Sequence, residues 1–284
     1  MSSRGRVLII GGQGRLGSAI RETWAPHSEV LVLTRQELDV KDEASVMRVC
    51  ESYQPELMIH TAGYTDIDLA EEEPEEAYRI NAYGARHVAR AARAVDARLV
   101  HFSTDQVFQG TPDQSYEETA YPLPVHTYGA SKVAGDRFIQ ALHPQSLIVR
   151  TAWLFGTCPV EEEIHRAASS SRISVWQVDP SVIGCPTYVP DLIRCVESLL
   201  ELHCSGLYHV TNSGSCTMQE FREALGALIP AFDWPKRSPH RTTHRARCPD
   251  RVVLDPAALT RTGIPPMRHW HEALVDWVNR KHEI

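Results

Sequence analysis

The chain has 284 residues, of which 43% are hydrophobic and 23% charged, and its formal net charge is −7. This length allows one large domain or two, and the acidic balance argues against sequence-independent binding to nucleic acid. The apolar runs are far too short to cross a membrane. Seven scattered cysteines, and a first strand so near the amino terminus that no signal peptide is expected, predict a cytoplasmic protein with reduced thiols.

The first half of the chain alternates short apolar runs with segments of helical spacing. The expected strands are residues 7–10, 29–33, 57–60, 98–102 and 146–150. The expected helices are residues 18–21, 44–53, 74–95 and 129–142. Repeated βαβ units predict an α/β fold, a Rossmann-type doubly wound parallel sheet with helices on both faces.

The second half is less regular and predicts a smaller lobe. It contains expected strands at 173–176 and 206–210, helices at 189–202, 218–229 and 270–280, and a loop at 230–251 rich in Pro, Arg and His. We therefore predict an NAD(P)-binding domain over residues 1–150. A substrate-binding lobe would follow over residues 151–284, with some segments returning to the main domain.

The turn after the first strand has the glycine spacing of a dinucleotide-binding fingerprint, between a strand and a helix. Gly11 allows the tight turn, Gly14 lets backbone N–H groups approach a pyrophosphate, and Gly17 lets the helix pack close to the sheet. The amino terminus of the helix adds free N–H groups and a partial positive charge. The turn therefore predicts a site for the cofactor pyrophosphate.

Residues after the second expected strand bear on the choice of cofactor. An NAD site usually has an acidic side chain here for the ribose 2′-hydroxyl, whereas this chain has Arg35. Arginine can pair with a 2′-phosphate, which favours NADPH; a solvated surface side chain is the alternative. Asp39 lies close by and could reach the adenine, so NADH stays open as a second cofactor.

A tyrosine and a lysine four residues apart, Tyr128 and Lys132, lie on one face of an expected helix. Free tyrosine has a pKa of about 10, and an adjacent ammonium group would lower it. The pair thus predicts a general acid for a carbonyl that accepts hydride. Thr104 follows the fourth strand, where active-site groups collect in open sheets, and its hydroxyl could orient that carbonyl.

Three longer motifs narrow the interpretation: STD-x-VF-x-G at 103–110, RT-x-W-x-x-G at 150–156 and G-x-PTY-x-x-DL at 184–192. With these motifs, the chain resembles the dTDP-4-dehydrorhamnose reductase (RmlD-like) family of extended short-chain dehydrogenase/reductases. Matching stretches cover almost the whole chain. The resemblance implies NADPH- or NADH-dependent reduction of the C4 keto group of a nucleotide-linked 4-keto-6-deoxyhexose. We assign no metal-binding residue.

The resemblance also implies roles for individual residues. Those expected at the cofactor pyrophosphate are Gly11, Gly14, Arg15, Leu16 and Gly17. Those expected beside the adenine or along the rest of the cofactor are Asp39, Val40, Ala62, Gly63 and Tyr64. The implied catalytic triad is Thr104, Tyr128 and Lys132; Lys132 would also hold the nicotinamide ribose, with support from Asn81. Asp105 and Trp153 would face the sugar nucleotide, with simple packing as the alternative for Trp153.

Three places depart from the family pattern: Gln106 replaces a Tyr, Ser181-Val182 an Asp-Gln pair, and Cys248-Pro249 an Arg-Pro pair. A different nucleotide, a different keto sugar or a lost activity would each be consistent. The loop arginines could clamp a diphosphate or form a solvated basic surface; they are Arg237, Arg241, Arg245, Arg247 and Arg251.

Two other functions stay open. One is a sugar-nucleotide epimerase or dehydratase of the same extended superfamily, which would retain its cofactor through turnover. The other is a dinucleotide-binding regulatory protein resembling the non-catalytic subunit of methionine adenosyltransferase. The acidic residues at 71–73 and 75–76 could bind a cation, or form the solvated first turn of a helix. The protein could be a homodimer.

Overall fold

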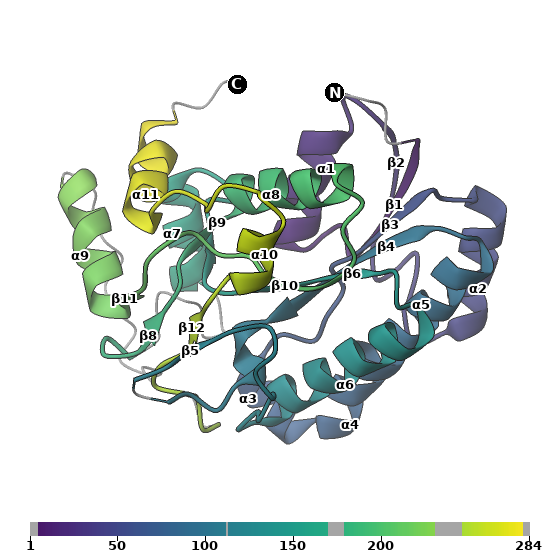
Figure 1. The fold of residues 1–284 in the computed structure, drawn as a ribbon, viewed down its shortest axis with the longest axis horizontal. Helices are drawn as coiled ribbons and strands as arrows, with labels where there is room; N and C mark the ends of the chain where they lie inside the picture. Colours follow the sequence, from purple (N-terminus) through teal and green to yellow (C-terminus); the bar gives the residue numbers. More distant parts are fainter. Residues whose placement is uncertain (1–4, 112, 170–178, 231–245, 281–284) are drawn as a thin grey trace.

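The computed structural model describes residues 5–111, 113–169, 179–230 and 246–280. Its centre is a parallel sheet with the strand order β10-β6-β4-β3-β1-β2 (Figure 1). The strands are β1 (Arg6–Ile10), β2 (Glu29–Leu33), β3 (Leu57–His60), β4 (Arg98–Thr104), β6 (Leu147–Thr151) and β10 (Gly206–His209). The predicted Rossmann-type sheet is confirmed.

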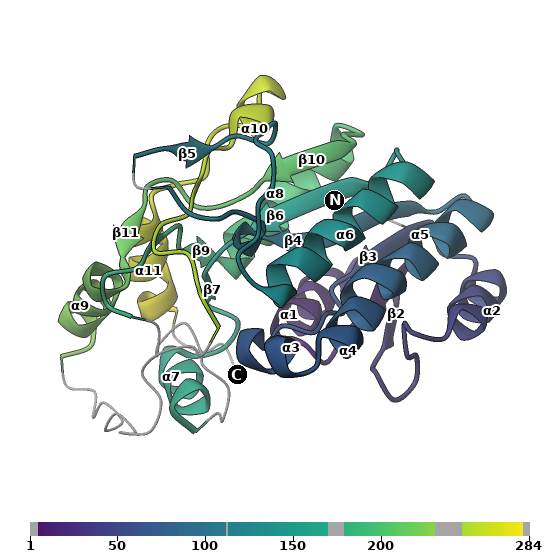
Figure 2. The ribbon, with the colours of Figure 1, turned by 90° about the horizontal axis from the view of Figure 1, so that it is seen from below.

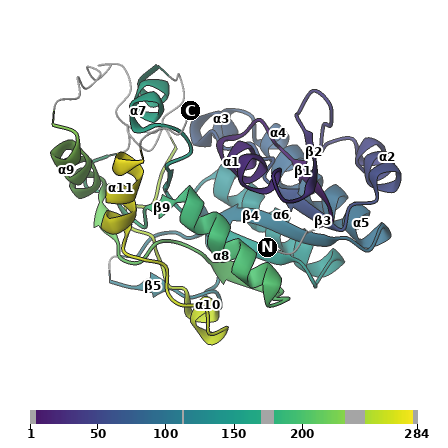
Figure 3. The same cartoon turned by 90° about the horizontal axis from the view of Figure 1, so that it is seen from above.

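Helices cover both faces of this sheet (Figures 2 and 3). On one face lie α1 (Arg15–Trp24) and α8 (Val189–Glu201). On the other lie α2 (Glu43–Tyr53), α5 (Ala85–Ala94) and α6 (Thr127–Leu142). Because side chains alternate along a strand, Val7 and Ile9 of β1 join the first core, and Leu8 and Ile10 join the second. All four are at most 1% exposed, which explains the continuous apolar run.

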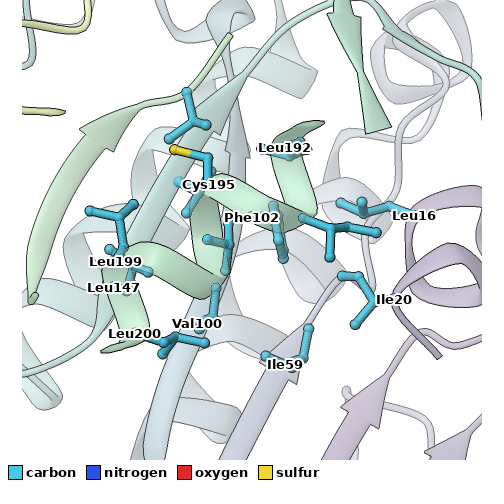
Figure 4. Packing of buried hydrophobic residues seen from close by; sticks show 14 of the residues in the cluster. Leu16, Ile20, Ile59, Val100, Phe102, Leu147, Leu192, Cys195, Leu199 and Leu200 are labelled. Atoms are coloured by element: carbon cyan, nitrogen blue, oxygen red, sulfur yellow. The ribbon is translucent and has the colours of Figure 1, made fainter. Parts of the chain in front are cut away.

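Figure 4 shows the first of these cores from close by. Leu16 and Ile20 of α1 and Leu199 of α8 pack there against Val100 of β4 and Leu147 of β6. This packing fixes the start of α1 relative to the ends of the strands. The glycine turn that leads into α1 is therefore held against the edge of the sheet where ligands bind in this fold.

The segment expected as one helix over 74–95 has a break in its hydrogen-bond pattern. It consists of α4 (Pro74–Tyr78), a π-helical turn η1 (Arg79–Gly84) and α5. Such turns are rare and often occur at functional sites. The helices α3 (Ile67–Glu72), α7 (Val160–Ser169) and α10 (Ala257–Arg261) and the 3-10 turn η2 (Asp105–Val107) were not expected from the sequence.

The second half builds a smaller unit from short pieces. These are β7 (Leu154–Phe155), β8 (Ile183–Gly184), β9 (Thr187–Tyr188), β11 (Cys216–Thr217), α9 (Met218–Leu228) and α11 (Trp270–Asn279). Its core contains five large aromatic side chains: Phe155, Tyr188, Phe221, Trp270 and Trp277. A further parallel pair joins β5 (Ser115–Tyr116) to β12 (Val253–Leu254). The domain boundary at residue 150 stays a prediction, and the strand expected at 173–176 lies outside the described residues.

β10 comes from the second half of the chain and pairs with β6 in the main sheet. Among the residues that the structure describes, no helix combines the length and apolarity needed to span a bilayer.

Candidate active site

A long groove runs along the ends of the sheet strands. One hollow, of about 220 Å³, lies beside the glycine turn and the residues after β2. A second, of about 490 Å³, lies in front of the end of β4 and the start of α6. The two share part of their lining: Gly14, Thr61, Ala62, Gly63, Thr65 and Asp66. The groove crosses the ends of β1 and β3, where the chain reverses its direction across the sheet, as in other open α/β sheets that bind nucleotides.

The glycine turn fits a pyrophosphate. Gly11 has a φ of +94°, and a Cβ on it would lie 2.5 Å from the Ala62 nitrogen. A Cβ on Gly17 would lie 2.5 Å from the Gly11 carbonyl oxygen. Gly14 stands at the N-cap of α1 and supplies no side-chain hydrogen bond, so within this described helix the first N–H groups remain for a ligand. Arg15, Leu16 and Gly17 line the second hollow at this point.

The first hollow contains the residues expected near the adenosine: Arg35, Asp39, Val40, Ala62, Gly63 and Tyr64. Two cations, one of them Arg35, meet on one carboxylate beside this hollow. The Arg35 guanidinium lies 3.3 Å from Glu76 Oε1, and Lys41 Nζ lies 2.7 Å from the same oxygen. Lys41 Nζ also lies 3.5 Å from Asp39 Oδ2. Arg35 is thus placed at the groove, with Glu76 as its present partner.

The second hollow brings together the residues expected to be catalytic or to face the sugar: Thr104, Asp105, Tyr128, Lys132 and Trp153. Lys132 Nζ donates a hydrogen bond of 2.7 Å to the Phe102 carbonyl oxygen, and Tyr128 is hydrogen-bonded to Thr104. Three elements far apart in sequence therefore converge on one cavity wall.

Trp153 has a left-handed backbone, with a φ of +41°. Its indole lies so close to Gly184 that a Cβ there would be 2.3 Å from Trp153 Cε2. Such strained conformations persist where the surrounding structure enforces them and cluster at functional sites. The indole is packed and also lines the hollow, and its contact with a sugar nucleotide stays a prediction.

Burial dominates the ionisation of the Tyr/Lys pair. It raises the pKa of Tyr128 to about 12, the interaction with the Thr104 side chain opposes this rise, and the Asp105 and Asp136 carboxylates raise the pKa further. Burial also lowers the pKa of Lys132 to about 8. The expected lowering of the Tyr128 pKa is therefore wrong for the protein alone, and Lys132 is not among the groups that shift this pKa. Tyr128 carries its proton at neutral pH, the state that a proton donor requires.

Asn81 connects the loop after β3 to helix α6 through side-chain hydrogen bonds. Its Oδ1 accepts from the Tyr64 backbone N–H at 2.8 Å, and its Nδ2 donates to the Tyr64 carbonyl oxygen at 2.9 Å. Nδ2 also donates to Ser131 Oγ at 2.9 Å, one residue before Lys132. Asn81 lies in the π-helical turn η1 and contacts the residue before Lys132, so its support of Lys132 stays a prediction.

The family model described as the RmlD substrate binding domain matches residues 5–283. The chain belongs to this family. The spore coat polysaccharide biosynthesis protein SpsK of Bacillus subtilis is 34% identical, over 97% of this chain and 98% of that protein. The dTDP-4-dehydrorhamnose reductase of Mycolicibacterium smegmatis is 33% identical, over 96% of this chain and 85% of that protein.

Solved structures share the fold. A crystal structure of dTDP-4-dehydrorhamnose reductase from Bacillus anthracis in complex with NADP has a TM-score of 0.85 and 35% identity, and covers 99% of each chain. The UDP-glucose 4-epimerase of Thermus thermophilus has a TM-score of 0.79 at 22% identity, with 96% and 98% coverage. That second likeness shows the fold alone.

The departures from the RmlD-family pattern fall mainly on the second hollow. Gln106, Val182 and Cys248 all line it. Of the loop arginines, Arg251 donates to the Gln114 carbonyl oxygen at 3.4 Å, whereas Arg237, Arg241 and Arg245 lie outside the described residues. The altered positions therefore border the hollow that also contains Thr104, Tyr128 and Lys132.

The acidic run at 71–76 makes protein contacts. Glu71 Oε1 accepts from the Thr127 N–H at 2.5 Å, and Glu73 Oε2 accepts from the Tyr64 hydroxyl at 2.7 Å. In the described part of the chain, no group of three or more His, Cys, Asp or Glu side chains is arranged to hold a metal ion.

Sequence reasoning missed a buried polar cluster behind Lys132. Asp136 Oδ2 accepts from Ser103 Oγ at 3.0 Å and from two Arg150 nitrogens at 3.2 Å each. The rings of His60 and His101 meet at 2.9 Å between their Nδ1 atoms. Two signals were present in the sequence: Asp136 stands four residues after Lys132, and both histidines sit on apolar strands that pair in the sheet.

Neutralising Glu76 should strengthen NADPH binding. Glu76→Gln frees Arg35 and Lys41 for a 2′-phosphate, so we expect the Kd of NADPH to fall about two- to fivefold, less at high salt. The Kd of NADH should stay the same. Quenching of protein fluorescence by each nucleotide measures both constants. Glu75→Gln, at an exposed neighbour, is the matched control; equal shifts for the two nucleotides would contradict the assignment.

Mild acid should destabilise the protein through its buried histidines. Burial lowers the pKa of His101 to about 4 and of His209 to about 3, and holds that of His60 well below its usual range. Unfolded histidines bind protons near pH 6.5, so stability is full above that pH and falls as the pH drops towards 4. Each such histidine contributes about 1.4 kcal/mol per pH unit.

Urea midpoints measured at a series of pH values test this slope. His209→Gln should reduce the pH dependence of the midpoint by the contribution of one histidine. A substitution at the exposed His27 should leave that dependence unchanged. A midpoint that stays constant from pH 7 to pH 5 would show that these rings are already protonated or exposed.

Proposed function

We propose that this protein is an NADPH-dependent reductase of the C4 keto group of a nucleotide-linked 4-keto-6-deoxyhexose, with NADH as a second cofactor. The observation that carries the proposal is the single groove in which a pyrophosphate-binding turn leads to Thr104, Tyr128 and Lys132. Relatives of similar length named dTDP-4-dehydrorhamnose reductase or dTDP-4-keto-6-deoxy-D-glucose reductase support it, as does the NADP-bound structure.

In this proposal the chain holds the cofactor along the whole groove. The residues that would hold it are Gly11, Gly14, Arg15, Leu16, Gly17, Arg35, Asp39, Val40, Ala62, Gly63, Tyr64, Asn81, Tyr128 and Lys132. Asn81 acts indirectly, by fixing the loop at Tyr64. Bound NADPH supplies the hydride.

The side chains at the second hollow handle the substrate. The Thr104 hydroxyl orients the keto oxygen, and Tyr128 donates its proton to that oxygen as negative charge develops there. Lys132, anchored at the Phe102 carbonyl oxygen, would hold the nicotinamide ribose. Asp105 and Trp153 would contact the sugar nucleotide. Because Gln106, Val182 and Cys248 border the same space, the exact sugar and nucleotide can differ from those of the named relatives.

The test is consumption of NADPH and of NADH in the presence of freshly generated dTDP-4-keto-6-deoxy sugar. Loss of one reduced nicotinamide per reduced sugar nucleotide supports the proposal. Isomerised sugar without net cofactor consumption would indicate an epimerase. Tight cofactor binding without any conversion would favour the regulatory alternative.

A further inference from the structure

A chain of polar side chains connects the start of α6 with Asp105. The Gly129 backbone N–H donates to His126 Nδ1 at 3.0 Å. His126 Nε2 lies 3.1 Å from Gln106 Oε1, and Gln106 Nε2 donates to Asp105 Oδ2 at 3.2 Å. The other carboxylate oxygen, Asp105 Oδ1, accepts from Thr104 Oγ1 at 3.0 Å.

The direction of these hydrogen bonds follows from their first member. A backbone N–H can only donate, so His126 Nδ1 must accept, and the neutral ring carries its proton on Nε2. That proton can only be given to the amide oxygen of Gln106, which turns the amide nitrogen towards Asp105. Asp105 therefore receives one donor on each oxygen and is held as an acceptor, which is the ionised form.

In this relay from His126 through Gln106 to Asp105, the two ends are buried and Gln106 is half-buried. His126 is 5% exposed and Asp105 4%. The His126 and Tyr128 rings are stacked, with centroids 6.0 Å apart and planes 15° apart. A Cβ on Gly129 would lie 2.1 Å from the Gln106 carbonyl oxygen, so α6 and η2 are pressed together at this point. This contact fixes the Gln106 backbone against α6, and its half-buried side chain lines the hollow between His126 and Asp105.

We propose that His126 and Gln106 are positioning residues that hold Asp105 as the acceptor for a sugar hydroxyl beside the reacting carbonyl. The proposal rests on the proposed function and names what its substrate must carry, a free hydroxyl next to the keto carbon. Gln106, Asp105, Thr104 and Tyr128 line the same hollow. A substrate without that hydroxyl would leave the second lone pair of a buried carboxylate oxygen without a donor, which is a strong basis for discrimination.

The surroundings of Asp105 determine how the relay affects its titration. Burial raises its pKa to about 6, and hydrogen bonds from Thr104 and Gln106 oppose that rise. The titratable groups that face it are Tyr128, Cys185 and Cys248. Removing the Gln106 donor takes stabilisation from the ionised form, so the pKa of Asp105 must rise further. The acceptor form is then lost at a higher pH.

The test compares Gln106→Met, which has a similar length but no hydrogen-bonding amide, with His126→Asn, which can still cap α6 but is too short to reach Gln106. We expect Gln106→Met to lower kcat/KM about 10- to 100-fold and to move the acidic limb of its pH profile upward. The Kd of NADPH should not change. When His126→Asn is added to Gln106→Met, kcat/KM should fall by less than about a further twofold, because both residues act through Asp105.

A second substrate and a second readout complete the design. The wild-type protein should strongly prefer the keto sugar nucleotide over its analogue lacking the adjacent hydroxyl, and Gln106→Met should lose most of that preference. Carboxyl-carbon NMR, with Asp105→Asn to assign the signal, follows the titration of Asp105 without turnover.

The outcomes separate the two proposals. An upward titration shift in Gln106→Met without any wild-type turnover would keep the relay and reject the reductase. Normal turnover with an unchanged titration, or additive losses in the double variant, would overturn the relay.

Discussion

Replacing Tyr128 by Phe should abolish turnover without affecting the binding of the cofactor. The substitution removes the hydroxyl that donates the proton and keeps the ring that packs against Ala70 and Ala77. Positioned general acids contribute about 10²- to 10⁴-fold, so kcat should fall by roughly that factor. Rapid-mixing measurements of cofactor oxidation with saturating sugar nucleotide give the rate of the chemical step directly.

Two controls accompany this variant. The Kd of NADPH and the melting temperature of Tyr128→Phe should match those of the wild-type protein, since the aromatic ring remains. Tyr83→Phe, at a tyrosine that is 45% exposed, should keep full activity. A Tyr128→Phe protein with kcat within about threefold of wild type would require another acid in the groove.

Replacing Asp136 by Ala should cause the largest loss of stability. Arg150 is 4% exposed, and Asp136 accepts two of its hydrogen bonds and one from Ser103. Removing one partner of a buried ion pair leaves an uncompensated charge and costs about 3–5 kcal/mol. The free energy of unfolding from urea titration measures the loss.

The matched control is Glu201→Ala, at an exposed carboxylate near the end of α8, which should change stability by about 0.5 kcal/mol or less. Asp136→Asn should lie between the two, because the amide oxygen still accepts from Arg150. A loss below about 1 kcal/mol in Asp136→Ala would mean that water reaches Arg150 once the carboxylate is gone.

Patterns among residues close in sequence predicted much of the fold and of the candidate site. The glycine turn, the apolar strands and the helical spacing of Tyr128 and Lys132 each depend on neighbours in sequence, and the structure places them as expected. Thr104 could be added because strand ends gather at one edge of an open sheet. These rules predicted which residues would meet in the groove before any contact was known.

Other features depend on contacts between distant segments. The π-helical turn that places Asn81 requires its hydrogen bonds to Tyr64 and Ser131. The link from His126 to Gln106 joins residues 20 positions apart, through a loop with no repeating pattern. The sign of the Tyr128 pKa shift follows from its burial, which spacing does not reveal. The spacing of residues in the sequence predicts which side chains lie close together. Their orientation and ionisation depend on how distant segments pack around them.

The transfer of deuterium tests the central claim most directly. NADPH deuterated at both C4 positions of its nicotinamide would be mixed with freshly generated dTDP-4-keto-6-deoxy sugar and the wild-type protein. The reductase proposal predicts a sugar nucleotide with one deuterium, bound to C4 of the hexose, for each cofactor oxidised. Sugar that is converted without gaining deuterium, or cofactor that remains fully reduced, would contradict it.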